Sequence, residues 1–520
     1  MIKNFPHSSA SGHTIAAAGL TLMLALLSGC HVGPKYVAPA MPAPPEFKEA
    51  APPAYANAPA GSWQPAQPQD AAIKGKWWEA FNEPELNSLE EQVDINNQNI
   101  AQYFQNFMAA RAVVREARSQ YYPTLTTDPS YTRAKSPATL HGAGTTSSGT
   151  SGTTANGVTS TVMSLPFDVS WEPDLWGKVA STVREYRNAA QVSAAVLENE
   201  RLTEQADLAE YYFELRGQDA LQALYDQTVK ADQQSLDLTK ALYETGIDND
   251  ESVAQAEVTL ENAQEVSTGI ATDRAIYEHA IATLIGKPAS SFSLPVKSLT
   301  TPVPAIPIGI PSQLLQRRPD VAAAERTMAE ANALIGVETA AYYPTLSLTG
   351  SGGLESSAIS TLFSTPALFW SAGASAAETI FDAGLRRATV DQYKAQYNAD
   401  AAAYKQTVLT AFQQVEDYSA TLRVTSGQIQ QEAIAIKSAQ RYLDIANSRY
   451  ETGLDPYLNV ISAETTLLSD QQTAVSLHVS EMTAAVELVQ ALGGGWNVTQ
   501  LPAAAQIATP AAQTAVANTP

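Results

Sequence analysis

The chain has 520 residues, enough for more than one structural unit and a large buried surface. Its formal net charge of −22 excludes a nucleic acid or an anionic membrane surface as a partner held by general basicity. Only 16% of the residues are charged, so much of the polar surface consists of Gln, Asn, Ser and Thr. This composition fits an ordinary acidic soluble protein, or one that exposes weakly charged surface to lipid, to a lumen or to copies of itself.

The N-terminus has the features of a signal peptide followed by a lipid anchor. Lys3 precedes an apolar run from Ile15 to Leu27, which is too short to span a bilayer comfortably. Cys30, the only cysteine, follows Leu-Ser-Gly in a pattern that resembles a bacterial lipobox, and the next residue, His31, favours sorting to the outer membrane. We predict that residues 1–29 are removed and that Cys30 carries lipid; a secreted protein with a chance cysteine is the alternative. No later apolar run is long enough for a transmembrane helix.

Residues 30–75 are rich in Pro, Ala and Gln and are expected to form an extended tail. A helical pattern without internal Gly or Pro follows from Leu86 to Ser119. Tyr121-Tyr122-Pro123 ends this helix and opens a strand-like stretch, and a loop rich in Gly, Ser and Thr runs from Gly142 to Thr161.

The clearest strand pattern follows this loop, where five apolar residues alternate with polar ones. A half-buried strand of a soluble protein has the same pattern, whereas a membrane barrel strand points its apolar residues to lipid and its polar residues to the lumen. The predicted lipid-facing residues are Met163, Leu165, Phe167, Val169 and Trp171.

A very long helical pattern then runs from Lys178 to Tyr243, with one Gly and no Pro. At 1.5 Å per residue it would span roughly 100 Å, more than a globular core needs. A seven-residue repeat in it, which predicts coiled-coil packing, consists of Leu208, Leu215, Val229, Leu236 and Tyr243, with Gln222 as the exception. The chain turns sharply at 244–250 and returns through a second helix that ends near Gly286.

The second half of the chain repeats the first. Tyr450-Glu451-Thr452-Gly453 matches Tyr243-Glu244-Thr245-Gly246, 207 positions earlier, so one helical hairpin is encoded twice. The second strand pair is expected to contain Leu368 and Trp370. In the second long helix the seven-residue repeat consists of Val408, Val415, Leu422, Ile429, Ile436, Leu443 and Tyr450. The first repeat is predicted at 76–286, with a strand hairpin at 121–173, and the second at 312–492, with a strand hairpin at 342–381 and a turn at 451–456. A Pro-rich segment at 287–311 joins the two repeats, and a flexible tail follows at 493–520.

Two strand hairpins in one chain have a consequence for assembly. A two-stranded hairpin is not stable alone, and in lipid every strand edge must be paired. Four strands are too few for the smallest membrane barrels of about eight, so several chains must pool their strands in a ring. We therefore predict an α+β membrane protein: a trimeric 12-stranded β-barrel continued by a periplasmic α-helical barrel, which is a conduit and not a catalyst.

Short motifs in a fixed order carry a family resemblance that extends from Cys30 to Trp496. The most specific is Arg317-Arg318-Pro319-Asp320 with Ala323-Ala324-Glu325. The others are Leu27-Ser28-Gly29-Cys30, Trp77-Trp78, Tyr121-Tyr122-Pro123, Leu175-Trp176-Gly177, Tyr342-Tyr343-Pro344, Phe381-Asp382-x-Gly384 and Tyr450-x-x-Gly453. In these motifs the chain resembles outer-membrane efflux lipoproteins of the NodT type, such as OprM and CusC, in the TolC superfamily.

The resemblance implies a homotrimer in the outer membrane, anchored by diacylglycerol and N-acyl groups on Cys30. It implies docking to a periplasmic adaptor (membrane fusion) protein and to an inner-membrane pump, usually proton-driven. The channel of such a system conducts small toxic compounds passively, has no cofactor and catalyses nothing. The identity of the transported substrate is not encoded in this chain, because the pump largely selects it.

The two turns are the candidate periplasmic gate. Gly246 and Gly453 fit helix ends that need a positive φ. Relatives often carry an acidic ring just past the second turn, but Asn459 and Ser462 occupy those positions here. The negative field would then come from acidic residues at or beside the turns, for which ordinary solvated turn positions are the alternative. These residues are Asp248, Asp250, Glu251 and Asp455.

Catalytic and metal sites are not predicted. The six histidines are scattered, and no Cys/His ligand spacing, nucleotide loop or nucleophile motif is present. Two other functions stay open: an exit duct for type I protein secretion, and a periplasmic coiled-coil structural lipoprotein. The lipobox and Arg317-Arg318-Pro319-Asp320 favour efflux over secretion, and the paired strand hairpins argue against the structural lipoprotein.

Overall fold

A computed structural model of the chain describes residues 32–39, 44, 47–49, 75–135, 159–299, 301–306 and 311–508. The predicted signal peptide, Cys30 and parts of the predicted tails and of the Gly/Ser/Thr loop lie outside these residues. None of the helices in the described segments is both long enough and apolar enough to cross a membrane.

The chain forms two compact units. The strand unit consists of the described residues of 1–37, 111–188 and 329–399, and the helix unit of those of 38–110, 189–328 and 400–520. The units do not coincide with the predicted repeats, because each of them draws on both halves of the chain.

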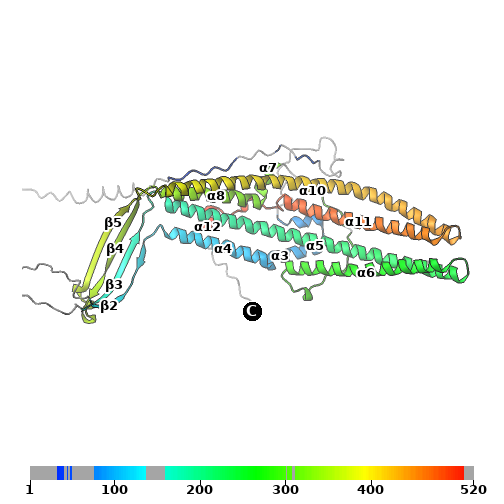
Figure 1. The fold of residues 1–520 in the computed structure, drawn as a ribbon, viewed down its shortest axis with the longest axis horizontal. Helices are drawn as coiled ribbons and strands as arrows, with labels where there is room; N and C mark the ends of the chain where they lie inside the picture. The colour runs from blue at the N-terminus through cyan, green and yellow to red at the C-terminus, as the bar shows by residue number, and fades with distance from the viewer. Residues whose placement is uncertain are drawn as a thin grey trace, which may run out of the picture. The chain divides into compact units, whose positions relative to one another are not determined.

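The strand unit contains an antiparallel sheet in the order β1-β3-β4-β5, with β2 also paired to β3 (Figure 1). The central pair joins the two predicted repeats, since β3 of the first pairs with β4 of the second. β1 and β2 follow one another along the same edge of β3, so the sheet has four strand positions. The bounds are β1 Thr124–Thr126, β2 Ser130–Lys135, β3 Thr159–Trp171, β4 Thr345–Ser356 and β5 Leu368–Ala377.

The start of β3 corrects the predicted loop. The loop predicted from composition extends to Thr161, but β3 begins at Thr159 and these residues pair with the end of β2, Lys135 with Thr159 and Arg133 with Thr161. Thr and Ser suit an edge of a sheet as well as a loop, and composition alone does not separate the two.

The predicted helix from Leu86 to Ser119 is wrong in one respect, because it is two helices, α3 (Pro84–Asn96) and α4 (Gln98–Ser119). Asn97 separates them with an extended backbone. Its side-chain oxygen accepts hydrogen bonds from the backbone N–H groups of Asn99 and Ile100, at 2.8 and 3.1 Å, as an N-cap does. Its amide nitrogen donates to the Glu204 carboxylate at 2.7 Å and to the Leu284 carbonyl at 3.0 Å.

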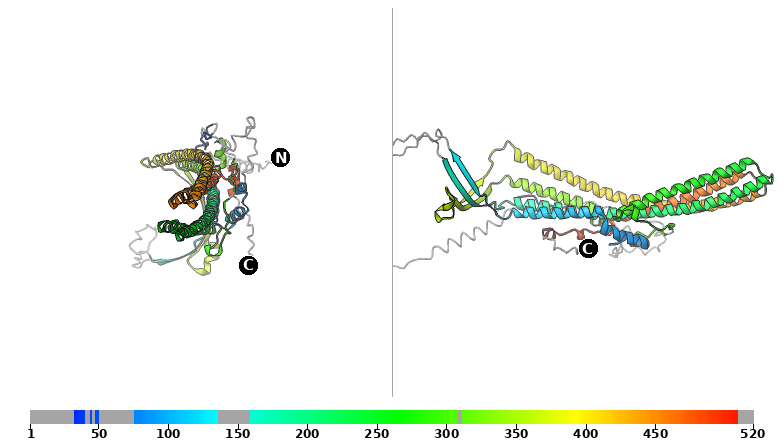
Figure 2. Two further views of the ribbon diagram at one scale, coloured as in Figure 1. Left: turned by 90° about the vertical axis from the view of Figure 1, so that its right-hand side faces the viewer. Right: turned by 90° about the horizontal axis from the view of Figure 1, so that it is seen from below.

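Four long helices form two hairpins that are copies of each other (Figures 1 and 2). The first hairpin is α5 (Lys178–Glu244) with α6 (Asp250–Leu284), and the second is α10 (Leu385–Glu451) with α11 (Tyr457–Ala491). Every boundary of the second hairpin lies 207 residues after its counterpart, so α5 and α10 each have 67 residues and α6 and α11 each have 35.

The seven-residue seam of α5 and α10 is largely buried, as coiled-coil packing requires. Val408 and Val415 of α10 and Leu208 and Leu215 of α5 are completely buried. Tyr243, at the end of the seam in α5, is the exception, with 47% of its surface exposed.

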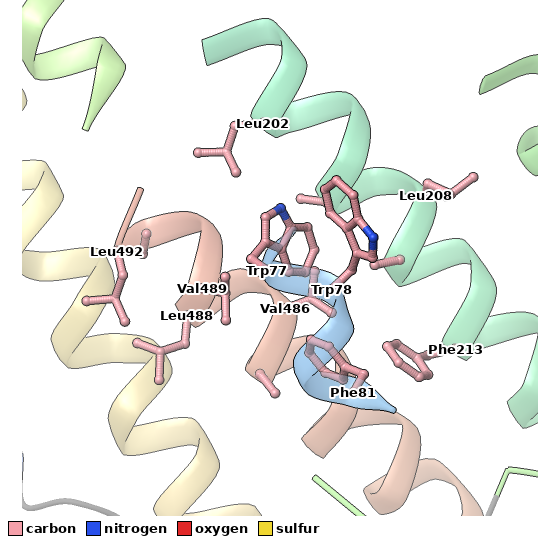
Figure 3. Packing of buried hydrophobic residues seen from close by; sticks show 14 of the residues in the cluster. Trp77, Trp78, Phe81, Leu202, Leu208, Phe213, Val486, Leu488, Val489 and Leu492 are labelled. Carbon is pink, nitrogen blue, oxygen red and sulfur yellow. The ribbon is translucent and has the colours of Figure 1, made fainter. Parts of the chain in front are cut away.

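The main core of the helix unit is built around the short helix η2 (Trp77–Phe81). Trp77, Trp78 and Phe81 are almost completely buried, and each large ring removes much apolar surface from water. Figure 3 shows these rings beside Leu208 and Phe213 of α5 and close to α11. The Trp-Trp motif therefore has a packing role.

An ion cluster ties the joining segment 287–311 to the helix unit. The guanidinium group of Arg216, whose side chain is 2% exposed, pairs with Asp219 at 2.8 Å and with Glu85 at 2.5 Å. Arg274 pairs with the other Asp219 oxygen at 2.7 Å. Both arginines also donate to carbonyls of the joining segment, those of Pro295 and Leu294. Removing one partner would leave a buried charge unpaired, which is strongly destabilising. The bonds to the carbonyls hold in place a joining segment that has little regular structure of its own.

The Arg-Pro-Asp part of the most specific motif also has a structural role. Pro319 begins α8 (Pro319–Ala340), and Arg318 lies between α8 and α7 (Pro311–Arg317). The Arg318 guanidinium makes two hydrogen bonds with Asp320, at 2.6 and 2.9 Å, which form an ion pair at this helix start. It also donates to the carbonyl of Ala491, the last residue of α11, at 3.1 Å. The motif therefore binds a helix start to the carbonyl end of α11.

Candidate channel site: the strand faces and the hairpin tips

The strand register divides the sheet into two chemically different faces. Residues directly opposite each other in paired strands lie on the same face of the sheet. The partners of each predicted lipid-facing residue of β3 therefore lie on the predicted lipid-facing side as well. Phe167 is paired with Gly352, which is paired with Trp370, and Leu165 is paired with Leu354, which is paired with Leu368.

The apolar face is continuous across the sheet and largely uncovered in the single chain. Trp370 is 79% exposed, Leu368 63% and Phe167 49%. Large apolar side chains that are exposed together mark a surface that contacts lipid or another chain. Its large apolar members are Leu125, Tyr131, Met163, Leu165, Phe167, Val169, Trp171, Leu346, Leu348, Leu354, Leu368 and Trp370, and the register also places Arg133 and Lys135 on this face at the end of β2.

The opposite face is made mostly of Ser, Thr and Gly. Asp168 lies there, paired with Ser351, and Glu355 lies there, paired with Ser164. In the described strand residues of this face these two are the acidic ones. The sheet therefore has one apolar face and one small-residue face that carries carboxylates, which is the distribution of a wall between lipid and water.

The two hairpin tips have the same backbone geometry. Gly246 and Gly453 have φ of 74° and 71°, as expected for a helix end that needs a left-handed residue. The N–H of Ile247 bonds to the Leu242 carbonyl at 2.9 Å, and the N–H of Leu454 bonds to the Arg449 carbonyl at 2.9 Å. Both tips are Schellman motifs, in which glycine avoids the steric cost of a Cβ at positive φ.

The first tip is tied to the second hairpin through Asp248. The Tyr450 hydroxyl, at the end of α10, donates to the Asp248 carboxylate at 2.7 Å and lies 3.2 Å from the Thr239 hydroxyl oxygen. Burial opposes ionisation of Asp248, yet bonds from Tyr450, the Asn249 amide and Ser252 hold the pKa of this carboxyl below its usual value. Burial, together with the adjacent Asp248 carboxylate, raises the pKa of Tyr450, whose hydroxyl thus stays a donor.

The second tip carries an ion pair within its own hairpin. Arg449 donates two hydrogen bonds to the Asp455 carboxylate, at 2.5 and 3.0 Å. These bonds, chiefly, and then the positive charge of Arg449 hold the pKa of Asp455 below its usual value. Asn459, where relatives often carry an acid, supports the same carboxylate with a side-chain hydrogen bond. The charge of Asp455 is therefore neutralised locally.

The remaining predicted gate residues are exposed in the single chain. Asp250 and Glu251 are exposed in the first turn of α6, and Ser462 is exposed in α11. Their role at the gate stays a prediction. The sequence reasoning missed Tyr450 and Arg449 as tip residues that hold carboxylates. For Arg449 the available signal was the 207-residue offset, which places Leu242 opposite it and so marks where the copies differ; for Tyr450 the offset gives no signal, because its counterpart Tyr243 is also a tyrosine.

No group of three or more His, Cys, Asp or Glu side chains in the described parts of the chain is arranged to hold a metal ion. Cys30, the predicted lipid anchor, lies outside those parts. The site therefore consists of a two-faced sheet and a pair of bonded helix tips.

The chain matches a family model described as "Outer membrane efflux protein" over residues 89–287 and 310–494. It is 30% identical to the antibiotic efflux pump outer membrane protein ArpC of Pseudomonas putida, over 93% of this chain and 96% of that protein. It is 31% identical to the toluene efflux pump outer membrane protein TtgF, also of P. putida, over 92% and 97% of the two chains. The solved structure of the outer-membrane channel OprN is similar with a TM-score of 0.79 and 27% identity, over 90% of this chain and 100% of that one.

Proposed function

Because the chain belongs to the outer membrane efflux protein family, we propose that it forms the exit duct of a tripartite efflux pump. The duct releases small toxic compounds, of the antibiotic or solvent classes for which its relatives are named, to the cell exterior. It is a passive conduit and not an enzyme.

The observation that carries this proposal is the two-faced sheet with unpaired edges. In the described residues, β5 is paired only with β4, and β1 and β2 are paired only with β3. Lipid contains no water to satisfy open strand edges, so these edges pair with strands of other copies. Three copies contribute twelve strands, with the apolar face on lipid and the Ser, Thr and Gly face on the lumen.

The hairpins supply the periplasmic part of the duct, and their tips form its gate. The bond from Tyr450 to Asp248 holds the two hairpins of one chain together, which keeps the tips in a closed arrangement. Opening requires that this bond break and that α10 and α11 move away from the first hairpin.

The partners follow from the same function. A periplasmic adaptor connects the duct to an inner-membrane pump, which is driven by protons and supplies the energy that the duct lacks. Diacylglycerol and N-acyl groups on Cys30 anchor each chain in the outer membrane. Replacement of Cys30 by Ala is expected to abolish incorporation of radiolabelled palmitate, whereas retained labelling would contradict the anchor.

The channel itself is tested with purified full-length protein in planar lipid bilayers. Trimers by native mass spectrometry and discrete, ohmic conductance steps are expected. A monomeric, non-conducting protein would contradict the proposal.

The alternative function, an exit duct for secreted proteins, is distinguished from efflux by deleting the gene. Increased susceptibility of the deletion strain to small toxic compounds supports efflux. Loss of a secreted protein without such a change supports secretion.

A further inference from the structure

A groove lies next to the two tips in the helix unit, between α6 and α11, with residues of α5 also lining it. Its volume is about 640 Å³, within the range of sites that hold drug-sized ligands. Two of its wall residues, Val258 and Leu458, are 58% and 59% exposed, so apolar surface is left without a cover inside it. The apolar wall consists chiefly of Val258, Val266, Leu458, Ile461 and Leu468.

Two carboxyl groups that carry buried oxygen atoms lie among these apolar residues. Asp232 of α5 is only 3% exposed, and its Oδ2 atom has no hydrogen-bond partner among the described residues. The Oε2 atom of Glu464 on α11 is likewise buried without a partner there. Buried polar atoms are nearly always bonded, so these two acceptor atoms of one groove lack the donors that such a site requires.

The charge of this pair is not compensated within the groove. Burial raises the pKa of Asp232 to about 6. Burial, and then the charge of Asp232, raises the pKa of Glu464 to about 7, although a bond with Ser235 acts in the opposite direction. The lining residues that the structure describes include a further acid, Glu251, and no Lys or Arg. When both carboxyl groups are ionised, a bridging water would satisfy the oxygen atoms but would not neutralise their charge.

We propose that the groove binds a small organic cation. Its protonated amine donates to Asp232 and Glu464, and its apolar body lies against the exposed walls of α6 and α11. A hydrated Mg²⁺ or Ca²⁺ ion fits poorly, because such ions require about six or more oxygen ligands and gain nothing from apolar walls. The proposal does not rest on the channel function, since binding is measured on the protein without conduction.

The test uses full-length protein in lipid nanodiscs at pH 8, where both carboxyl groups are ionised. The probe is 2-phenylethylamine, and its neutral analogue is 2-phenylethanol, which has nearly the same shape without the charge. Isothermal titration is expected to show one amine per chain and at least about tenfold weaker binding of the alcohol, since hydrogen bonds to charged groups exceed neutral ones by this amount. Equal affinity for the two compounds, or no binding of the amine at millimolar concentration, would overturn the proposal.

Variants locate the binding. Asp232→Asn combined with Glu464→Gln keeps the shape of the site and is expected to reduce amine affinity at least about tenfold. Val258→Trp fills the groove without changing the carboxyl groups and is also expected to abolish binding. Glu261→Gln, on the exposed side of α6 and outside the groove, is the matched control and leaves the affinity unchanged. Full amine affinity in the double variant or in Val258→Trp would refute the site.

Discussion

Removal of the Tyr450 hydroxyl group is the smallest substitution that is expected to shift the proposed gate toward its open state. Tyr450→Phe removes one hydrogen bond to a carboxylate, worth about 1.5–3 kcal/mol, so the equilibrium between closed and open tips shifts by roughly tenfold or more. Open probability in planar bilayers is the measurement, and it should rise.

Tyr243→Phe is the matched control for this change, because Tyr243 is the counterpart of Tyr450 in the first repeat and is largely exposed. It is expected to leave the open probability as in the wild type. An equal rise in both variants would show that the Asp248 bond is not what closes the tips.

Replacement of Glu464 is expected to change the stability of the protein in a pH-dependent way. Its pKa in the folded protein, about 7, lies above the ordinary value of 4.5 because of burial and then the Asp232 charge. Folding therefore favours the protonated carboxyl group, and ionising this group in the folded protein lowers the free energy of unfolding. This loss of stability is absent below pH 4.5, grows as the pH rises, and is complete above about pH 7. Glu464→Gln removes it, so the variant should be more stable than the wild type by about 1–3 kcal/mol at pH 8 and no more stable at pH 4.

Thermal unfolding of the assembled protein at the two pH values measures this difference. Glu261→Gln, an exposed acid on α6, should show no such pH-dependent gain. A Glu464→Gln protein that melts below the wild type at pH 8 would mean that the ionised carboxylate stabilises the fold.

At the scale of the strand, the two faces predict opposite outcomes for neighbouring residues of β5. Trp370→Lys places a charge on the apolar face, at a cost of about 2–4 kcal/mol near the middle of a bilayer. Ser371→Lys, one residue further along, places the same charge on the small-residue face that also carries Asp168. The amount of trimer in isolated outer membranes should fall strongly for the first variant and little for the second.

The helical hairpins could be predicted from sequence because their signals are local and repeated. The seven-residue period and the 207-residue offset depend only on residues within one helix or its copy. The break at Asn97 was missed, because its N-cap bonds to Asn99 and Ile100 are local but its bonds to Glu204 and to the Leu284 carbonyl join it to residues distant in the chain. The Tyr450–Asp248 bond was missed for the same reason, since it joins different hairpins.

The faces of the sheet were predictable in part. The five alternating apolar residues of β3 indicate one apolar face, and the start of β4 alternates Leu346 and Leu348 with Ser347 and Thr349, but the short β1 and the Gly-rich remainder of β4 carry little alternation of their own. Their faces follow from the register with β3, which no local pattern contains.

At the scale of the whole molecule, the small-residue face predicts the ion selectivity of the proposed duct. Asp168 and Glu355 are its acidic residues in the described strands, and three copies would place six carboxylates around the lumen. Negative groups along a narrow lumen attract cations, so the wild-type channel should prefer K⁺ over Cl⁻.

Asp168→Asn combined with Glu355→Gln should lower this preference, measured as the reversal potential in a KCl gradient. Asp455→Ala should have less effect, because Arg449 already neutralises that carboxylate. The reverse order of effects would place the selectivity at the tips and not at the strands.

The equal length of the two hairpins has a consequence for the symmetry of the proposed trimer. Three chains with two matching hairpins each present six almost equivalent tips, so the tube end approaches sixfold symmetry although the assembly is threefold. Residues that differ between the copies break this equivalence: Leu242 against Arg449, and Glu251 against Leu458. A partner with true sixfold symmetry would therefore contact two alternating kinds of tip. One kind has the acidic start of α6, the other has the apolar start of α11, and the partner must bind both.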